Sequence, residues 1–169
     1  MNKTEIAEIL ARPYSQALLN GSEPARFAYD GLDGDPRVIP IGFWMAGDQL
    51  QIATVPKAAK VAALRKNPKV ALTIDTGAFP PKVLLLRGTA EVELVQGVPE
   101  GYLIAGRKVM ADEDQYNGWL EGVKALYDEM IVITVTLTWA KLLDFETTIP
   151  KAVEDLIAAK QATRTEQQS

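Results

Sequence analysis

The fold is decided by residues 82–95, KVLLLRGTAEVELV, which form the longest β-type segment of the sequence. Four apolar residues follow one another from Val83 to Leu86, which indicates a strand buried on both faces. From Thr89 to Leu94 polar and apolar residues alternate, as in a strand with one buried face. A strand of this kind belongs in a closed or covered sheet.

Five further strands are predicted around this segment, mostly joined by short turns. Asp33-Gly34 is a hairpin signal, and Gly47-Asp48 is a second turn. Short turns favour antiparallel neighbours. The predicted strands cover residues 26–29, 37–45, 49–54, 69–75 and 130–138, the last continuing past Trp139 to Phe145.

The predicted helices are separated from the strands. Thr4 is expected to cap a helix that runs through Ala11 and stops at Pro13. Other helices are expected at residues 56–67, at two places within 99–127, and at 150–162. The prediction is an α+β fold, a six-stranded antiparallel split β-barrel of Greek-key type with peripheral helices. Residues 1–162 would form one domain and residues 163–169 a polar C-terminal tail.

Composition excludes several classes of function. The 169 residues include no cysteine and no histidine, so disulfides, thiolate nucleophiles, Ser-His-Asp triads and the usual zinc centres are ruled out. A net charge of −4 argues against general binding of nucleic acid. The acidic residues 112–114 fit a helix start better than a metal site, and the Asp-rich turn at 30–35 lacks the distal Glu of an EF-hand. No metal site is predicted.

No signal peptide or membrane span is predicted. The amino terminus has no apolar core, and no segment approaches the ~20 apolar residues that a spanning helix needs. A cytoplasmic protein without membrane partners is therefore expected.

The segment from Thr54 to Leu64, TVPKAAKVAAL, carries positive charges at a predicted helix start, where positive charge is unfavourable. Pro56 suits a first helical position, which would place Lys57 and Lys60 together in the first turn. A helix amino terminus disfavours each cation by about 0.3–1 kcal/mol. A bound anion would remove the conflict, because backbone N–H groups and two lysines would surround it. The alternative is that both are ordinary solvated lysines.

Three pieces of the sequence resemble the split-barrel flavoproteins of the pyridoxamine 5′-phosphate oxidase-like superfamily. They are the strand at 34–44, the segment Ile52-Ala53-Thr54 followed six residues later by Lys60, and residues 86–92. The similarity covers roughly residues 12–150.

The resemblance implies a flavin site. In that family the strand matching 38–42 lies along the isoalloxazine ring, and the cofactor phosphate sits at the start of the helix after the next strand. The family is usually dimeric with the flavin between subunits, so Arg107, Trp119 or Trp139 is expected to reach a neighbouring chain's site, with a core or surface role as the alternative for each tryptophan. The implied cofactor-binding residues are Val38, Ile39, Pro40, Ile41, Gly42, Thr54, Lys57, Lys60, Val61, Arg107 and Trp139.

Departures from the sequence of the family's oxidase argue against vitamin B6 oxidation as the function of this protein. Residues 139–147 replace the oxidase's C-terminal substrate motif, and Val83 stands near the position of a glutamine directed at the flavin. The expected function is an FMN-dependent oxidoreductase acting on a small conjugated substrate. A reductase using the deazaflavin coenzyme F-420 and a non-catalytic flavin or tetrapyrrole carrier are the alternatives. No catalytic residue is assigned.

Overall fold

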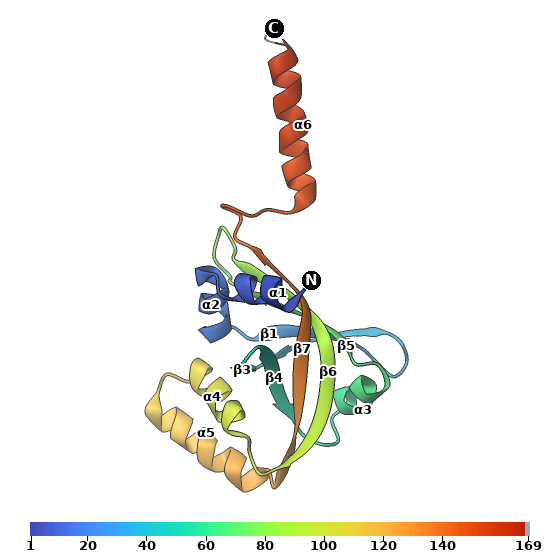
Figure 1. The fold of residues 1–169 in the computed structure, drawn as a ribbon. Helices are drawn as coiled ribbons and strands as arrows, with labels where there is room; N and C mark the ends of the chain where they lie inside the picture. The colour runs from blue at the N-terminus through green and yellow to red at the C-terminus, as the bar shows by residue number, and fades with distance from the viewer. Residues whose placement is uncertain (168–169) are drawn as a thin grey trace.

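The computed structural model describes residues 1–167, with side-chain surroundings described through residue 163. Seven antiparallel strands form one curved sheet in the order β2-β1-β5-β6-β7-β4-β3 (Figure 1). The long central pair β6–β7 runs in register from Val83 opposite Leu143 to Gln96 opposite Glu129, with a bulge after Arg87. The strands are β1 (Ala25–Asp30), β2 (Pro36–Ile41), β3 (Trp44–Ala46), β4 (Gln49–Thr54), β5 (Lys69–Asp75), β6 (Val83–Gln96) and β7 (Glu129–Leu143).

The α+β antiparallel architecture is confirmed, but the predicted number of six strands is wrong. The strand expected over 37–45 is interrupted at Gly42-Phe43, where Phe43 turns into the core and is only 2 % exposed. Residues before the interruption pair with β1 and residues after it pair with β4. Within residues 1–167, β2 and β3 therefore occupy opposite edges of the sheet, which does not close between them.

Alternating burial along the strands creates two apolar clusters on opposite faces of the sheet. The main cluster includes Phe27, Ile52 and Ile133 and is completed by side chains from α1, α2 and α3. The smaller one joins Ala53 of β4 to Ala105 of α4. Neighbouring residues Ile52 and Ala53 serve different clusters because successive side chains of a strand point to opposite faces.

Residues 1–167 form six helices, and the starts of the first two differ from the sequence prediction. The capping residue of the first helix is Asn2, whose side chain accepts from the N–H of Glu5, rather than Thr4. Pro13 stands at the first position of α2, where its missing N–H is harmless, so residues 13–20 are helical. The helices are α1 (Lys3–Leu10), α2 (Pro13–Asn20), α3 (Ala59–Lys66), α4 (Glu100–Val109), α5 (Glu113–Leu126) and α6 (Lys151–Gln167).

The lysine helix starts later than predicted. The N–H of Ala58 donates to the carbonyl of Val55 at 3.1 Å, which closes a turn over residues 55–58. Pro56 occupies the second position of this turn, which also suits its fixed φ. Lys57 therefore lies in the turn, and Lys60 alone belongs to the first turn of α3.

The last helix projects away from the sheet (Figure 1) and is longer than predicted. It continues to Gln167 rather than ending near Ala162, so the proposed tail is helical as far as 167, and residues 168–169 lie outside the described residues. None of the helices in residues 1–167 has the length and apolar composition needed to cross a membrane.

Candidate cofactor site

The gap between the two sheet edges is the natural place for a ligand. One wall is β2, which pairs with β1 only and so presents a free row of backbone groups on its other edge. The other wall is the end of β4: β3 pairs with residues 49–51 alone, so Ile52, Ala53 and Thr54 have no strand on that side. The two halves of the predicted flavin site therefore lie on the two walls of this split.

Thr54 and Lys60 are brought together at the end of β4. The Lys60 Nζ donates to the Thr54 Oγ1 at 3.2 Å, and both residues are half-buried. Among the described side chains Lys60 has no carboxylate partner, and burial lowers the pKa of Lys60. Ala58, the N-cap of α3, supplies no side-chain acceptor for the helix N–H groups. A cation, a hydroxyl and an uncapped helix start together suit an anion such as phosphate.

Two further predicted cofactor-binding residues, Lys57 and Val61, are placed differently. Lys57 is exposed in the turn before the helix. Val61 is 2 % exposed in the main core, and its N–H already donates to the Ala58 carbonyl at 2.9 Å. Lys60 therefore offers the anion more than Lys57 does, and Val61 offers it no free group.

The predicted ring-binding strand presents an apolar face to the outside. Val38 is 65 % exposed and Pro40 is exposed, whereas Ile39 and Ile41 pack against the main core. A planar ring could lie on this face and hydrogen-bond to the free edge of β2. Gly42, which follows, is exposed and leaves room beside α4.

A cleft of about 410 Å³ opens beside the end of β2, within the size range of small-molecule sites. Neither this cleft nor its half-buried lysine, Lys108, was predicted from the sequence. The helical spacing of Tyr102, Ala105 and Gly106 identifies the inward face of α4 but not what that face meets. The cleft is lined by residues 21–24, 40–43 and 53, by Tyr102, Ala105, Gly106, Lys108, Val109 and Met110, and by Trp119.

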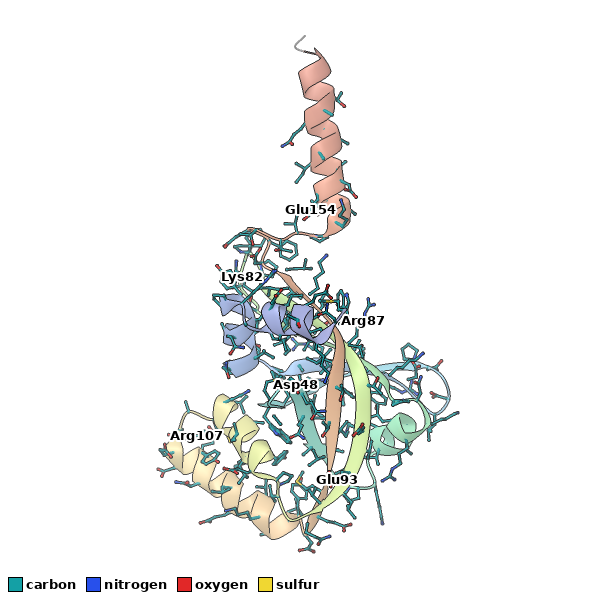
Figure 2. All side chains as sticks on the ribbon, in the orientation of Figure 1. Asp48, Lys82, Arg87, Glu93, Arg107 and Glu154 are labelled. Atoms are coloured by element: carbon teal, nitrogen blue, oxygen red, sulfur yellow. The ribbon has the colours of Figure 1, made fainter. Side chains whose placement is uncertain are left out.

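Arg107 and Trp139 lie away from Lys60 on this chain. Arg107 is exposed on α4 (Figure 2). It forms an ion pair with Glu113, and its guanidinium lies 4.8 Å from the centroid of the Tyr116 ring. Trp139 lies on β7 with the Arg87 guanidinium 4.5 Å from its ring centroid. Figure 2 shows Arg87 and Arg107 at well-separated parts of the molecule. The expected contribution of these two residues to a neighbouring chain's site stays a prediction.

Two glycines of α4, Gly101 and Gly106, allow this helix to pack closely against neighbouring tryptophan rings. We expect Gly106→Ala to lower the free energy of unfolding by about 1–3 kcal/mol through overpacking. A Cβ at Gly106 would lie 2.3 Å from the Trp119 ring, and one at Gly101 would lie 2.1 Å from Trp44. Urea unfolding measures the effect. Gly122→Ala on α5 is the control: its Cβ would meet open space, and the variant should gain up to about 1 kcal/mol from helix propensity. Equal effects of the two substitutions would contradict the packing account.

Among the described residues no cluster of three or more acidic side chains forms a metal site. Asp33 instead pairs with Arg37, and Asp112 caps α5 by accepting from the Gln115 N–H at 2.8 Å.

Comparison with known proteins identifies the family and the fold. The family model described as pyridoxamine 5′-phosphate oxidase matches residues 13–137, about three quarters of the chain. A search of the curated proteins found no match. Similar solved structures include an F420 reductase, with 22 % identity, a TM-score of 0.56, and coverage of 75 % of this chain and 94 % of that one. A conserved hypothetical protein from Mycobacterium tuberculosis has 17 % identity, a TM-score of 0.56 and coverage of 90 % and 94 %.

A third similar structure is general stress protein 26 from Bacillus anthracis, with 15 % identity, a TM-score of 0.55 and coverage of 78 % and 92 %. At these identities the three structures show a shared fold and no more. The family match, which covers both walls of the split, goes further. The chain belongs to the pyridoxamine 5′-phosphate oxidase family, within the flavin-binding split-barrel superfamily that its sequence resembles.

Proposed function

We propose that this protein is a flavin-dependent oxidoreductase that holds FMN in the split between β2 and β4. The observation that carries the proposal is the pairing of Lys60 with Thr54 at the uncapped start of α3, without a described carboxylate to neutralise the lysine. An ammonium ion, a hydroxyl and free backbone N–H groups suit a phosphate monoester. The apolar outer face and free edge of β2 would hold the ring.

A bound flavin supplies hydride transfer, and the protein's part is to bind and orient the ring. The chain has no histidine or cysteine, so any required proton comes from solvent, a tyrosine, a lysine or a carboxylate. The substrate is expected to be small and conjugated, because it must stack close to the ring.

The positions of Arg65 and Lys66 favour FMN over the deazaflavin coenzyme F-420. The deazaflavin's acidic tail would call for further cations beside the phosphate site. Arg65 and Lys66 belong instead to the last turn of α3, and the Lys66 Nζ donates to the Leu32 carbonyl at 3.2 Å. Arg65 follows Lys60 by five positions in the helix, a rise of about 7.5 Å along the axis.

The outer face of the sheet supports a homodimer. Directly paired residues on five strands place Val38, Ala28, Ala71, Arg87 and Trp139 side by side on this face. All five are exposed or half-buried, and most are small or apolar. Such a row, continuous with the ring-binding part of β2, suits contact with a second copy and would bring Trp139 towards the partner's flavin.

We expect Ala71→Glu to weaken this dimer at least fivefold, about 1 kcal/mol, because the new carboxylate would lose water at the interface. Ala71 is exposed in the chain, so the fold should be unaffected. Sedimentation velocity across a dilution series measures the dissociation constant. Glu91→Gln, on an exposed part of β6 outside the row, is the control. An unchanged association of the Ala71 variant would place the interface elsewhere.

The proposed function is tested by titrating the purified protein with FMN and with the deazaflavin. Tighter binding of FMN is expected. Failure to bind either cofactor would overturn the oxidoreductase proposal. Repeated reduction and reoxidation of the bound cofactor with an electron donor supports an enzyme, whereas stoichiometric binding without turnover supports a carrier.

A further inference from the structure

Lys108 is held in the cleft without a counter-ion among the described side chains. Its Nζ donates to the carbonyls of Leu19 at 2.7 Å and of Phe43 at 3.4 Å, and lies 4.7 Å from the centroid of the Phe43 ring. An ammonium group has three donors, so one is left after these two bonds. Glu23, the carboxylate at the rim of the cleft, is exposed and forms no ion pair with Lys108 among the described side chains.

Aromatic residues complete the cleft around this cation. Tyr102 and Trp119 approach with ring centroids 5.5 Å apart, and both line the cavity. Burial raises the pKa of Tyr102, so its phenol stays protonated and can donate a hydrogen bond. Burial also lowers the pKa of Lys108, a cost that an anionic ligand would offset.

The proposed phosphate site, formed by Thr54 and Lys60 at the start of α3, is called the phosphate anchor below. The cleft and this anchor meet β2 at different places. Ala59, at the start of α3, shares a smaller cavity with Arg37 near the hairpin end of β2. The cleft of Lys108 instead includes Pro40, Ile41 and Gly42 at the far end of the strand. The cleft also includes Ala53, the residue before Thr54, but neither Thr54 nor Lys60 lines it. A ligand in this cleft would therefore adjoin the ring-binding strand and lie beside the anchor without occupying it.

We propose that the α4 cleft is the substrate pocket and that Lys108 recognises an anionic substituent on a small planar conjugated substrate. The inference rests on the proposed flavin function, since the pocket adjoins the strand assigned to the flavin ring. The aromatic walls of Tyr102 and Trp119 suit a planar ring, and the free donor of Lys108 selects a negative oxygen. Lys108 is thus a specificity-determining residue.

The test compares two quinones of similar size on the FMN-loaded full-length protein: 1,4-naphthoquinone-2-sulfonate, which is anionic, and 2-methyl-1,4-naphthoquinone, which is neutral. Binding is followed by tryptophan fluorescence, and FMN affinity is measured separately for every variant. Lys108→Gln keeps a donor for the Leu19 carbonyl but removes the charge. It should weaken binding of the sulfonate at least fivefold, change binding of the neutral quinone less than twofold, and leave FMN affinity unaltered.

Lys108→Arg should retain the preference for the anion, and Lys124→Met, at an exposed lysine of α5, should bind both probes like the parent protein. Equal effects of Lys108→Gln on both quinones, with FMN still bound, would overturn the role of Lys108 and leave the flavin proposal intact. Lack of FMN binding by the parent protein would overturn both proposals.

Discussion

Lys60→Glu is expected to raise the dissociation constant for FMN at least tenfold, a loss of about 1.4 kcal/mol. The Lys60 Nζ lies 3.2 Å from the Thr54 hydroxyl, and the substitution replaces this cation with a carboxylate on the same side of the helix start, so phosphate would meet repulsion in place of attraction. The fold should tolerate it, because an acidic residue is favoured in the first turn of a helix and Lys60 forms no described ion pair. Quenching of flavin fluorescence on binding measures the affinity.

Arg65→Glu is the matched control, since it changes the net charge equally on the same helix but in its exposed last turn. Its effect should stay below about threefold, because screening weakens exposed charges over such distances. Lys57→Glu should give an intermediate loss. If Lys60→Glu bound FMN as tightly as the parent protein, Lys60 would be an ordinary solvated lysine and the anchor would have to be sought elsewhere.

Much of the sheet could be predicted because its long strands carry their own pattern. The apolar run and the alternation in residues 82–95 locate β6 within one residue at each end. The interruption at Gly42-Phe43 could not be predicted, because it depends on which sheet edge each half joins. The structural roles of Pro13 and Pro56 were predicted wrongly for a related reason. A proline can stop a helix, start one or occupy a turn, and the packing of the flanking residues decides which of these it does.

Part of the candidate site could likewise be predicted from the sequence, and part could not. Thr54 and Lys60 are six residues apart on consecutive elements, so their meeting could be inferred from local sequence. The environment of Lys108 could not, because its two carbonyl partners lie 89 and 65 residues away along the chain. Leu19 and Phe43 accept these hydrogen bonds through their backbone carbonyls. Their side chains therefore give no sign in the sequence that they bind Lys108.

The loop after β7 is a separate structural feature that the sequence did not reveal. Asp144 is only 4 % exposed, and its carboxylate accepts hydrogen bonds from the N–H groups of Glu146, Thr147 and Thr148 and from the Thr147 hydroxyl. These bonds hold Phe145 at a φ of 56°, a conformation that is unfavourable for a non-glycine residue. The loop fixes how the chain leaves the sheet for α6.

Asp144→Ala is accordingly expected to lower the free energy of unfolding by about 2–3 kcal/mol, because several donors lose a charged acceptor at once. The melting temperature should fall by roughly 4–12 °C for a chain of this size. Asp144→Asn keeps one acceptor oxygen for the three N–H groups and should cost about half as much. Glu146→Gln, which removes the charge from the ion pair with Lys82 and keeps an acceptor for the Tyr14 hydroxyl, should cost much less than either Asp144 substitution.

The same carboxylate predicts how stability depends on pH. The hydrogen bond from Thr147, followed by the three backbone N–H groups, holds the pKa of Asp144 far below its usual value. The stabilisation is therefore fully present above the unfolded pKa of about 3.9 and is lost as the pH falls towards the folded pKa. Urea unfolding of the parent protein and of Asp144→Asn at pH 7 and pH 3 should show a smaller difference between them at pH 3. A difference that stays constant with pH would mean that the charge of Asp144 contributes nothing and that the loop is held by geometry alone.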